Sequence, residues 1–363
     1  MLINENKIKK IFSHTNKFRV FCGFDGYVDR IVKVVKSVNG TKKEYFGTVA
    51  EFSNYLSTKS AKSCSLEMDV KAIKIGGNMP IFANSMAMMG IGTDCVGAFG
   101  YPQPTPIFEQ MHENCILHSV STPGTCDALE FDDGKIMLAV NEGISNLNFS
   151  KILSVLPIEK LQVLTKQPDG FAFLNWSELP FSNDIWKGFA DNILNEPSKQ
   201  KPFLVDLSDC SCRTSDEISE LFEILQTISQ KFYLCLSLNQ NETEQLSKKL
   251  GLSAGSLNDM AIAIAEKTKA NFLVLHLADR AVGFFETEIF TVKKDLIQNP
   301  AVITGGGDNF NAGLMLGLLY KDICDFSICE LLEFSNAVSS LYVKNGRSHD
   351  IESIIKFIGG DIL

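Results

Sequence analysis

The chain has 363 residues, of which 45% are hydrophobic and 21% charged, the composition and length of a globular protein with one large or two smaller domains. A net charge of −9 and a pI near 5.2 argue against a protein that binds nucleic acid by neutralising phosphates. The first residues lack a secretory apolar core, and no apolar run reaches the roughly 20 residues that span a bilayer. We therefore expect no membrane partner and a cytoplasmic location.

Short apolar runs alternate with helical patterns along the chain. Strands are predicted at 18–25, 94–100, 170–176, 202–208, 232–239 and 272–278, and helices at 80–90, 216–229, 241–251 and 257–270. The strands are apolar on both faces, which is typical of a parallel sheet covered by helices on both sides. The predicted fold class is α/β, with a doubly wound, mostly parallel central sheet in one domain over 1–363. Ligands of such sheets bind beyond the carboxyl ends of the strands.

Two segments, about 27–50 and 118–141, do not follow this alternation. Both contain hairpin-like turns, at Asn39-Gly40 and Asp133-Gly134. They predict small antiparallel ribbons that project from the parallel core.

The cysteines and histidines give no metal-binding pattern. Ten cysteines are scattered, and only Cys210 and Cys212 lie close together, without a second pair or a nearby histidine. The five histidines are isolated in the sequence. We expect a reducing compartment and no metal site built from protein ligands alone.

The stretch ITGGGDNFNAG at 303–313 places three glycines and one acid before a strongly apolar segment. The free amides of Gly305, Gly306 and Gly307 at a helix start predict an anion site. Asp308 fits such a site if it removes a proton from an attacking hydroxyl. The alternative is a glycine turn into a buried helix that Asp308 caps. No Gly-Lys-Ser/Thr follows, so the stretch is not a P-loop.

Two further elements complete an ordered set. Gly76, Gly77 and Asn78 follow an apolar run and open a helix, and an Asn-x-x-Glu match at Asn241 and Glu244 follows the predicted strand 232–239. With Gly305–Asp308, these elements stand in the order typical of PfkB-family (ribokinase-like) carbohydrate kinases, which the chain resembles over nearly its whole length.

The resemblance implies transfer of the γ-phosphoryl group of ATP to an alcohol of a sugar or nucleoside, with Mg²⁺ required. Asp308 would be the base, and Gly305, Gly306 and Gly307 the anion hole. Asn241 and Glu244 would organise Mg²⁺ and its waters. The alternative for these two is a cap and a first-turn acid on an exposed helix.

The resemblance also implies an acceptor site near the first strand. Gly76, Gly77 and Asn78 would lie along the sugar, and either Asp29 or Asp25 would bind its hydroxyls. We favour Asp29, which lies where the core strand passes into the ribbon; the alternative is a pair of turn acids. The ribbons would form a lid that excludes water, and a homodimer through this lid is expected.

Three positions depart from the family pattern. Val302 replaces an acid that helps form a monovalent-cation site, which places potassium activation in doubt. Gly306 replaces an alanine, and Leu277–Ala281 lacks the glycines usual at the nucleotide-side turn. The hypotheses are an ATP-dependent sugar kinase, a nucleoside kinase of the same fold, or a non-catalytic descendant that binds a sugar or nucleotide. Asp308 favours a kinase, because a binding module needs no base.

Overall fold

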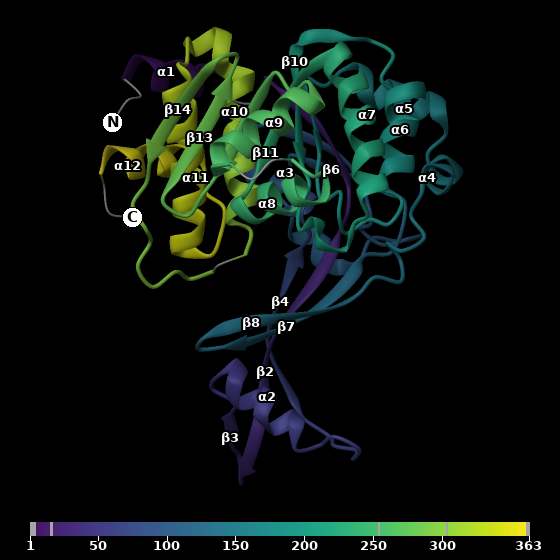
Figure 1. Ribbon diagram of the computed structural model, residues 1–363, viewed down its shortest axis with the longest axis vertical. Helices are drawn as coiled ribbons and strands as arrows, with labels where there is room; N and C mark the ends of the chain where they lie inside the picture. The colour runs from purple at the N-terminus through teal and green to yellow at the C-terminus, as the bar shows by residue number, and fades with distance from the viewer. Residues whose placement is uncertain (1–4, 15–16, 253–254, 303, 361–363) are drawn as a thin grey trace.

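The computed structural model describes residues 5–14, 17–252, 255–302 and 304–360. Figure 1 shows a large α/β body from which a narrow arm projects. None of the helices in the described part of the chain has the length and apolar character needed to cross a membrane.

The body is built on one nine-stranded sheet in the order β14-β13-β12-β11-β10-β9-β1-β5-β6. Seven neighbouring strands are parallel, and β13 and β14 add an antiparallel edge. The strands are β1 Arg19–Phe24, β5 Gly92–Gly97, β6 Cys115–Ser119, β9 Gly170–Phe173, β10 Ser198–Asp206, β11 Phe232–Leu238, β12 Phe272–His276, β13 Arg280–Phe285 and β14 Glu288–Lys293. All six predicted strands are present in this sheet.

Helices cover both faces of the sheet, each over its own apolar core. One face packs against α4 Phe149–Val155, α5 Ile158–Lys166, α6 Ser182–Asn192, α7 Ser215–Lys231, α8 Gln240–Lys249 and α9 Leu257–Thr268. The other packs against α1 Glu5–His14, α3 Asn78–Met88, α10 Gly306–Cys324, α11 Ile328–Asn345 and α12 Ile351–Gly359. Two short 3₁₀ helices, η1 Pro106–Gln110 and η2 Cys210–Cys212, lie in loops. The predicted doubly wound fold class is confirmed.

The arm consists of a second sheet and helix α2 Val49–Ser57, with the order β3-β2-β7-β8 and β4 paired to β2. Its strands are β2 Tyr27–Asn39, β3 Lys42–Tyr45, β4 Met68–Gly76, β7 Gly124–Phe131 and β8 Gly134–Val140. Hairpins join β2 to β3 and β7 to β8 at the predicted turns. The ribbon prediction omitted β4 and included part of β6, which lies in the main sheet. The arm is also not purely antiparallel, because β2 and β7 run parallel.

This topology brings polar residues to one edge of the main sheet. Asp25 follows β1, Asp206 ends β10, Asn239 follows β11 and His276 ends β12. Because these strands are parallel, their carboxyl ends meet at the same edge, where a doubly wound sheet binds its ligands.

Candidate active site

The glycine stretch turns the chain into α10. Gly305 adopts a φ of +86°, and a Cβ there would lie 2.6 Å from Tyr342 Oη, so only glycine fits. A Cβ on Gly306 would lie 3.0 Å from Val343 Cγ2, which explains why alanine, usual here in the family, is absent. Gly306 and Gly307 form the first turn of α10 and leave its amides uncovered by side chains. Ile303 lies outside the described residues.

Asp308 lies in the first turn of α10 and is 7% exposed. Its carboxylate has no hydrogen bond or ion pair with any residue that the structure describes. Burial raises its pKa well above the ordinary value, and the neighbouring charges of Asp206, Asp25 and Glu242 add to this shift. Asp308 is therefore an acid beside free amides, and none of the cations that the structure describes forms an ion pair with it.

Asp25, the first of the two candidate acceptor acids, is fully buried and caps the start of α3. It accepts hydrogen bonds from the amides of Asn78 (2.8 Å) and Met79 (2.9 Å) and from Asn175 Nδ2 (2.7 Å). Burial raises its pKa to about 6 despite these donors. A Cβ on Gly77, whose φ is +91°, would lie 2.7 Å from Asp25 Oδ2, so this glycine permits the close approach.

Asp29 on β2 faces a cavity of about 580 Å³, which we call the arm-side cavity; it is lined in part by Lys33, Lys74, Lys135 and Tyr342. No hydrogen bond to its side chain is found among the described residues. Burial raises its pKa to about 6, partly offset by the charge of Lys135. Of the two predicted acceptor acids, the structure directs Asp29 into a cavity and uses Asp25 as a cap.

The early glycine element contacts these acids and does not itself line the arm-side cavity. A Cβ on Gly76 would lie 2.3 Å from Asp29 Oδ1, so glycine is needed where β4 passes Asp29. The Asn78 side chain donates to Ser208 Oγ at 2.9 Å. It thus connects α3 to the loop after β10.

The Asn-x-x-Glu match lies two residues earlier than predicted. Asn239 caps α8, and its amide and its Nδ2 donate to the two carboxylate oxygens of Glu242 at 2.9 and 2.7 Å. Glu242 is 3% exposed. Asn241 and Glu244 are exposed on α8, where Glu244 accepts a hydrogen bond from Gln240. The assignment to Asn241 and Glu244 needs correction, because the capping box turns Glu242 inward.

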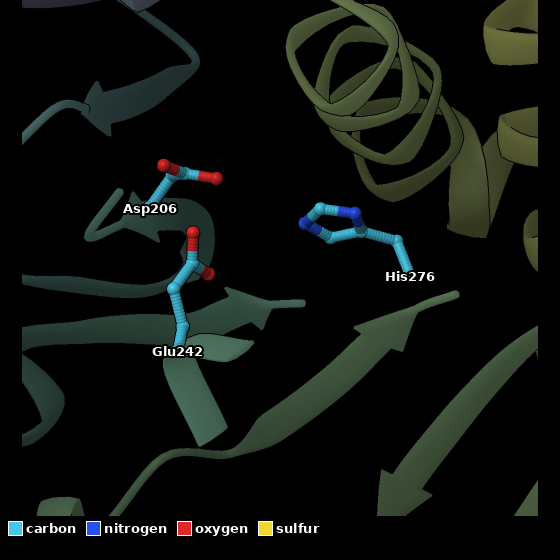
Figure 2. A group of neighbouring side chains, drawn as sticks. All are labelled: Asp206, Glu242 and His276. Carbon is cyan, nitrogen blue, oxygen red and sulfur yellow. The ribbon is translucent and has the colours of Figure 1, made fainter. Parts of the chain in front are cut away.

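Three side chains that sequence reasoning missed meet at this edge. The ligand atoms of Asp206, Glu242 and His276 all lie within 4.8 Å of one another (Figure 2). Burial raises the pKa of Asp206 to about 6, and burial and the Asp206 charge raise that of Glu242. Burial and the nearby Lys294 lower the pKa of His276 to about 4. The histidines are isolated in the sequence, but the fold brings His276 beside two carboxylates. Asp206 and His276 each end a correctly predicted strand, a signal that could have identified them.

A second cavity of about 320 Å³, which we call the helix-side cavity, lies beside Gly306 and Gly307. Its wall has an apolar part, formed by Leu277, Ile297, Pro300, Val302 and Val343, and a polar part that includes His276, Lys294 and Asp295. Val302 offers no carboxylate for a monovalent cation. The turn at Leu277 is closed by its amide, which donates to the Arg280 carbonyl at 2.9 Å, without the usual glycines.

The comparison with known proteins decides the family. A family model described as prokaryotic ketohexokinase matches residues 5–360. The chain belongs to the prokaryotic ketohexokinase family. A curated ketohexokinase from Haloferax volcanii is 26% identical to it over 348 residues, which are 94% of this chain and 91% of that protein.

Solved structures share the fold of this ketohexokinase-family chain. Adenosine kinase from Sinorhizobium meliloti superposes with a TM-score of 0.66 at 14% identity, over 95% of this chain and 99% of that one. A ribokinase II candidate from Escherichia coli, solved in complex with ATP and Mg²⁺, has a TM-score of 0.62 at 13% identity, over 94% and 99%. The predicted ribokinase-like (PfkB) family and enzyme class are confirmed: the protein is a carbohydrate kinase.

Proposed function

We propose that this enzyme transfers the γ-phosphoryl group of ATP to a hydroxyl of a ketohexose, with Asp308 as the base. The observation that carries the proposal is the carboxylate of Asp308, buried at the first turn of α10 with no counter-ion among the described residues. A base needs an unpaired carboxylate within reach of the reacting hydroxyl. The family of the chain and its curated relative support the ketohexose as acceptor.

In the proposed reaction, one proton is transferred, one bond to phosphorus forms and one breaks. Asp308 accepts the proton of the acceptor hydroxyl, the hydroxyl oxygen bonds to the γ-phosphorus, and the bond from that phosphorus to the leaving oxygen of ADP breaks. The amides of Gly305, Gly306 and Gly307 and the dipole of α10 receive the transferred phosphoryl group. ATP would extend from these amides into the helix-side cavity, the apolar part of which suits a nucleobase.

The residues present fit Mg²⁺. Asp206 and Glu242 offer carboxylate oxygens, the donors that this ion prefers, at the edge that would hold the phosphates. Burial raises the pKa of both carboxyl groups, and neither forms an ion pair with a lysine or arginine among the described residues. When bound, Mg²⁺ neutralises negative charge that develops on the phosphates.

Asp29 would bind acceptor hydroxyls in the arm-side cavity. This cavity is lined by charged residues, which suit a polyhydroxylated ligand better than a nucleobase; they are Asp29, Lys33, Lys74 and Lys135. The fold alone does not separate a sugar from a nucleoside acceptor, since adenosine kinase shares it. A coupled ADP-release assay with D-fructose and with adenosine separates the two, and turnover of adenosine alone would establish the nucleoside kinase. If neither of these compounds nor any other alcohol leads to release of ADP, the non-catalytic alternative is favoured.

The deciding experiment replaces the base. Asp308→Asn preserves shape but removes the proton acceptor, so we expect kcat to fall by about 10²- to 10⁴-fold while ATP still binds in isothermal titration calorimetry. Asp216→Asn, at an exposed acid in the first turn of α7, is the control and should turn over at the wild-type rate. Equal rates for Asp308→Asn and wild type would overturn the assignment of the base.

We also propose that the arm pairs two copies of the chain. β8 is an edge strand of the arm sheet, and its Leu138 and Val140 are 52% and 61% exposed. An unpaired strand edge with exposed apolar side chains is a template for association.

A further inference from the structure

Three potential ligands of a metal ion converge from three separate elements. Asp206 ends β10, Glu242 lies in the first turn of α8, and His276 ends β12. One ligand atom from each lies within 4.8 Å of the others. Figure 2 shows the ring nitrogen of His276 that is farther from its Cβ, Nε2, directed toward the two carboxylates.

The Nε2 atom of His276 is shielded from solvent and has no hydrogen-bond partner in the described structure. A buried polar atom without a partner is costly, and each such case needs an explanation. A neutral imidazole offers the lone pair of one ring nitrogen to a metal ion. The ring is held in place, since it packs 5.4 Å from the Phe310 ring and a Cβ on Gly307 would lie 3.2 Å from Cε1.

The two carboxylates are oriented by neighbours that leave lone pairs unused. Asp206 accepts hydrogen bonds from the amide and the hydroxyl of Ser208, at 3.2 and 3.5 Å, and from Asn311 Nδ2 at 2.8 Å. Glu242 accepts from the amide and the side chain of Asn239. Such outer contacts are what fix the ligands of a metal centre. No ion pair between either carboxylate and a lysine or arginine is found among the described residues.

We propose that Asp206, Glu242 and His276 bind one divalent transition-metal ion directly, with Mn²⁺ or Co²⁺ preferred to Mg²⁺. Magnesium prefers oxygen ligands and keeps its waters, whereas imidazole suits the first-row transition metals. The site lies where the proposed function places the nucleotide phosphates, so the inference deepens that function by naming a metal preference. Binding in the absence of nucleotide is tested separately from turnover.

The separations suit such an ion after small side-chain rotations. Donors at about 2.1 Å from one octahedral ion lie roughly 3 to 4 Å from one another. Ligand atoms already within 4.8 Å therefore need to close by only about 1 Å, which rotations about the side-chain bonds of Glu242 and Asp206 can supply.

The test measures binding of Mn²⁺, Co²⁺ and Mg²⁺ to the nucleotide-free full chain by isothermal titration calorimetry. We expect one Mn²⁺ per chain, bound at least tenfold more tightly than Mg²⁺. In His276→Gln, Mn²⁺ and Co²⁺ should bind about 10- to 100-fold more weakly, with Mg²⁺ changed far less. His349→Gln, at a histidine beside Asn345 near the start of α12, is the matched control and should bind Mn²⁺ like wild type.

A second measurement on the wild-type protein does not depend on the variant folding. Electron spin echo envelope modulation of bound Mn²⁺ should show coupling to an imidazole nitrogen. Equal Mn²⁺ affinity in wild type and His276→Gln, absence of nitrogen coupling, or no Mn²⁺ binding without nucleotide would each overturn the proposal. Direct Mn²⁺ binding without phosphorylation of any alcohol would instead overturn the proposed function and leave the metal site standing.

Discussion

Asp29 is an acid on the wall of the arm-side cavity whose environment has a cost in folding stability. It lies on β2, mostly buried, without a hydrogen-bond donor among the described residues, and burial raises its pKa to about 6. Between pH 4 and 6 the folded chain therefore holds a proton at Asp29 that the unfolded chain has lost. Stability falls with rising pH wherever the folded state binds more protons.

We predict that Asp29→Asn removes this dependence. The unfolding free energy of wild type should fall relative to that of Asp29→Asn as pH rises from about 4 to about 6, and the difference should stay constant above. The change is at most about 3 kcal/mol, since one pKa unit corresponds to about 1.4 kcal/mol. Urea denaturation at pH 4 to 8, without ligands, measures it. Asp191→Asn, on the exposed face of α6, should instead track wild type; parallel curves for all three proteins would contradict the raised pKa.

At the level of elements, α8 shows where sequence prediction reached its limit. The segment Asn239–Glu244 contains two overlapping Asn-x-x-Glu matches, and spacing alone does not rank them. The capping box decides, because Asn239 is the residue whose side chain accepts from the amide of Glu242, and this fixes which glutamate turns inward. A search for capping boxes at the expected helix start would have found it.

We predict that the two glutamates of α8 differ in function. Glu242→Gln should lower kcat by at least about 10²-fold, because it removes a carboxylate from the edge at which we propose that the phosphates bind. Glu244→Gln should remain within about twofold of wild type, because Glu244 is exposed and accepts a hydrogen bond from Gln240 on the surface of α8. Steady-state rates with D-fructose and ATP measure both. A larger loss in Glu244→Gln than in Glu242→Gln would restore the assignment made from sequence.

Six of the seven parallel strands were predictable from sequence because each is an apolar run that is largely buried on both faces. Residues of the candidate site were predictable only where they belong to a local sequence motif, as at Gly305–Asp308 and Gly76–Asn78. Asp206 and His276 come together through the order of strands in the sheet, which no local pattern encodes. The same holds for β4, whose pairing with β2 depends on a contact between segments about 40 residues apart.

At the level of the whole molecule, the arm carries an exposed sheet that projects from the body. Its strands carry apolar side chains that the chain itself leaves uncovered, among them Ile73, Met137, Leu138 and Val140. Only Phe46, Phe52 and a few neighbours form a small core between α2 and this sheet. The arm therefore has more apolar surface than a single copy can bury.

We predict a dimer that depends on this surface. Light scattering should give twice the chain mass of 40.1 kDa for wild type. Leu138→Asp combined with Val140→Asp should give the mass of one chain, because burying two charges at the interface is costly. Ile289→Asp, at a 47% exposed residue of β14 in the main sheet, should remain dimeric. A wild-type mass of one chain at micromolar concentration would rule out the arm as a dimer interface.

Pro300 and Val302 border both the arm-side and the helix-side cavities. The wall between the two cavities is thus formed in part by one short segment of the chain. A molecule bound in either cavity would contact residues that also line the other cavity. With the acceptor in the arm-side cavity and ATP in the helix-side cavity, as proposed, binding of either substrate should change the affinity for the other by the same factor.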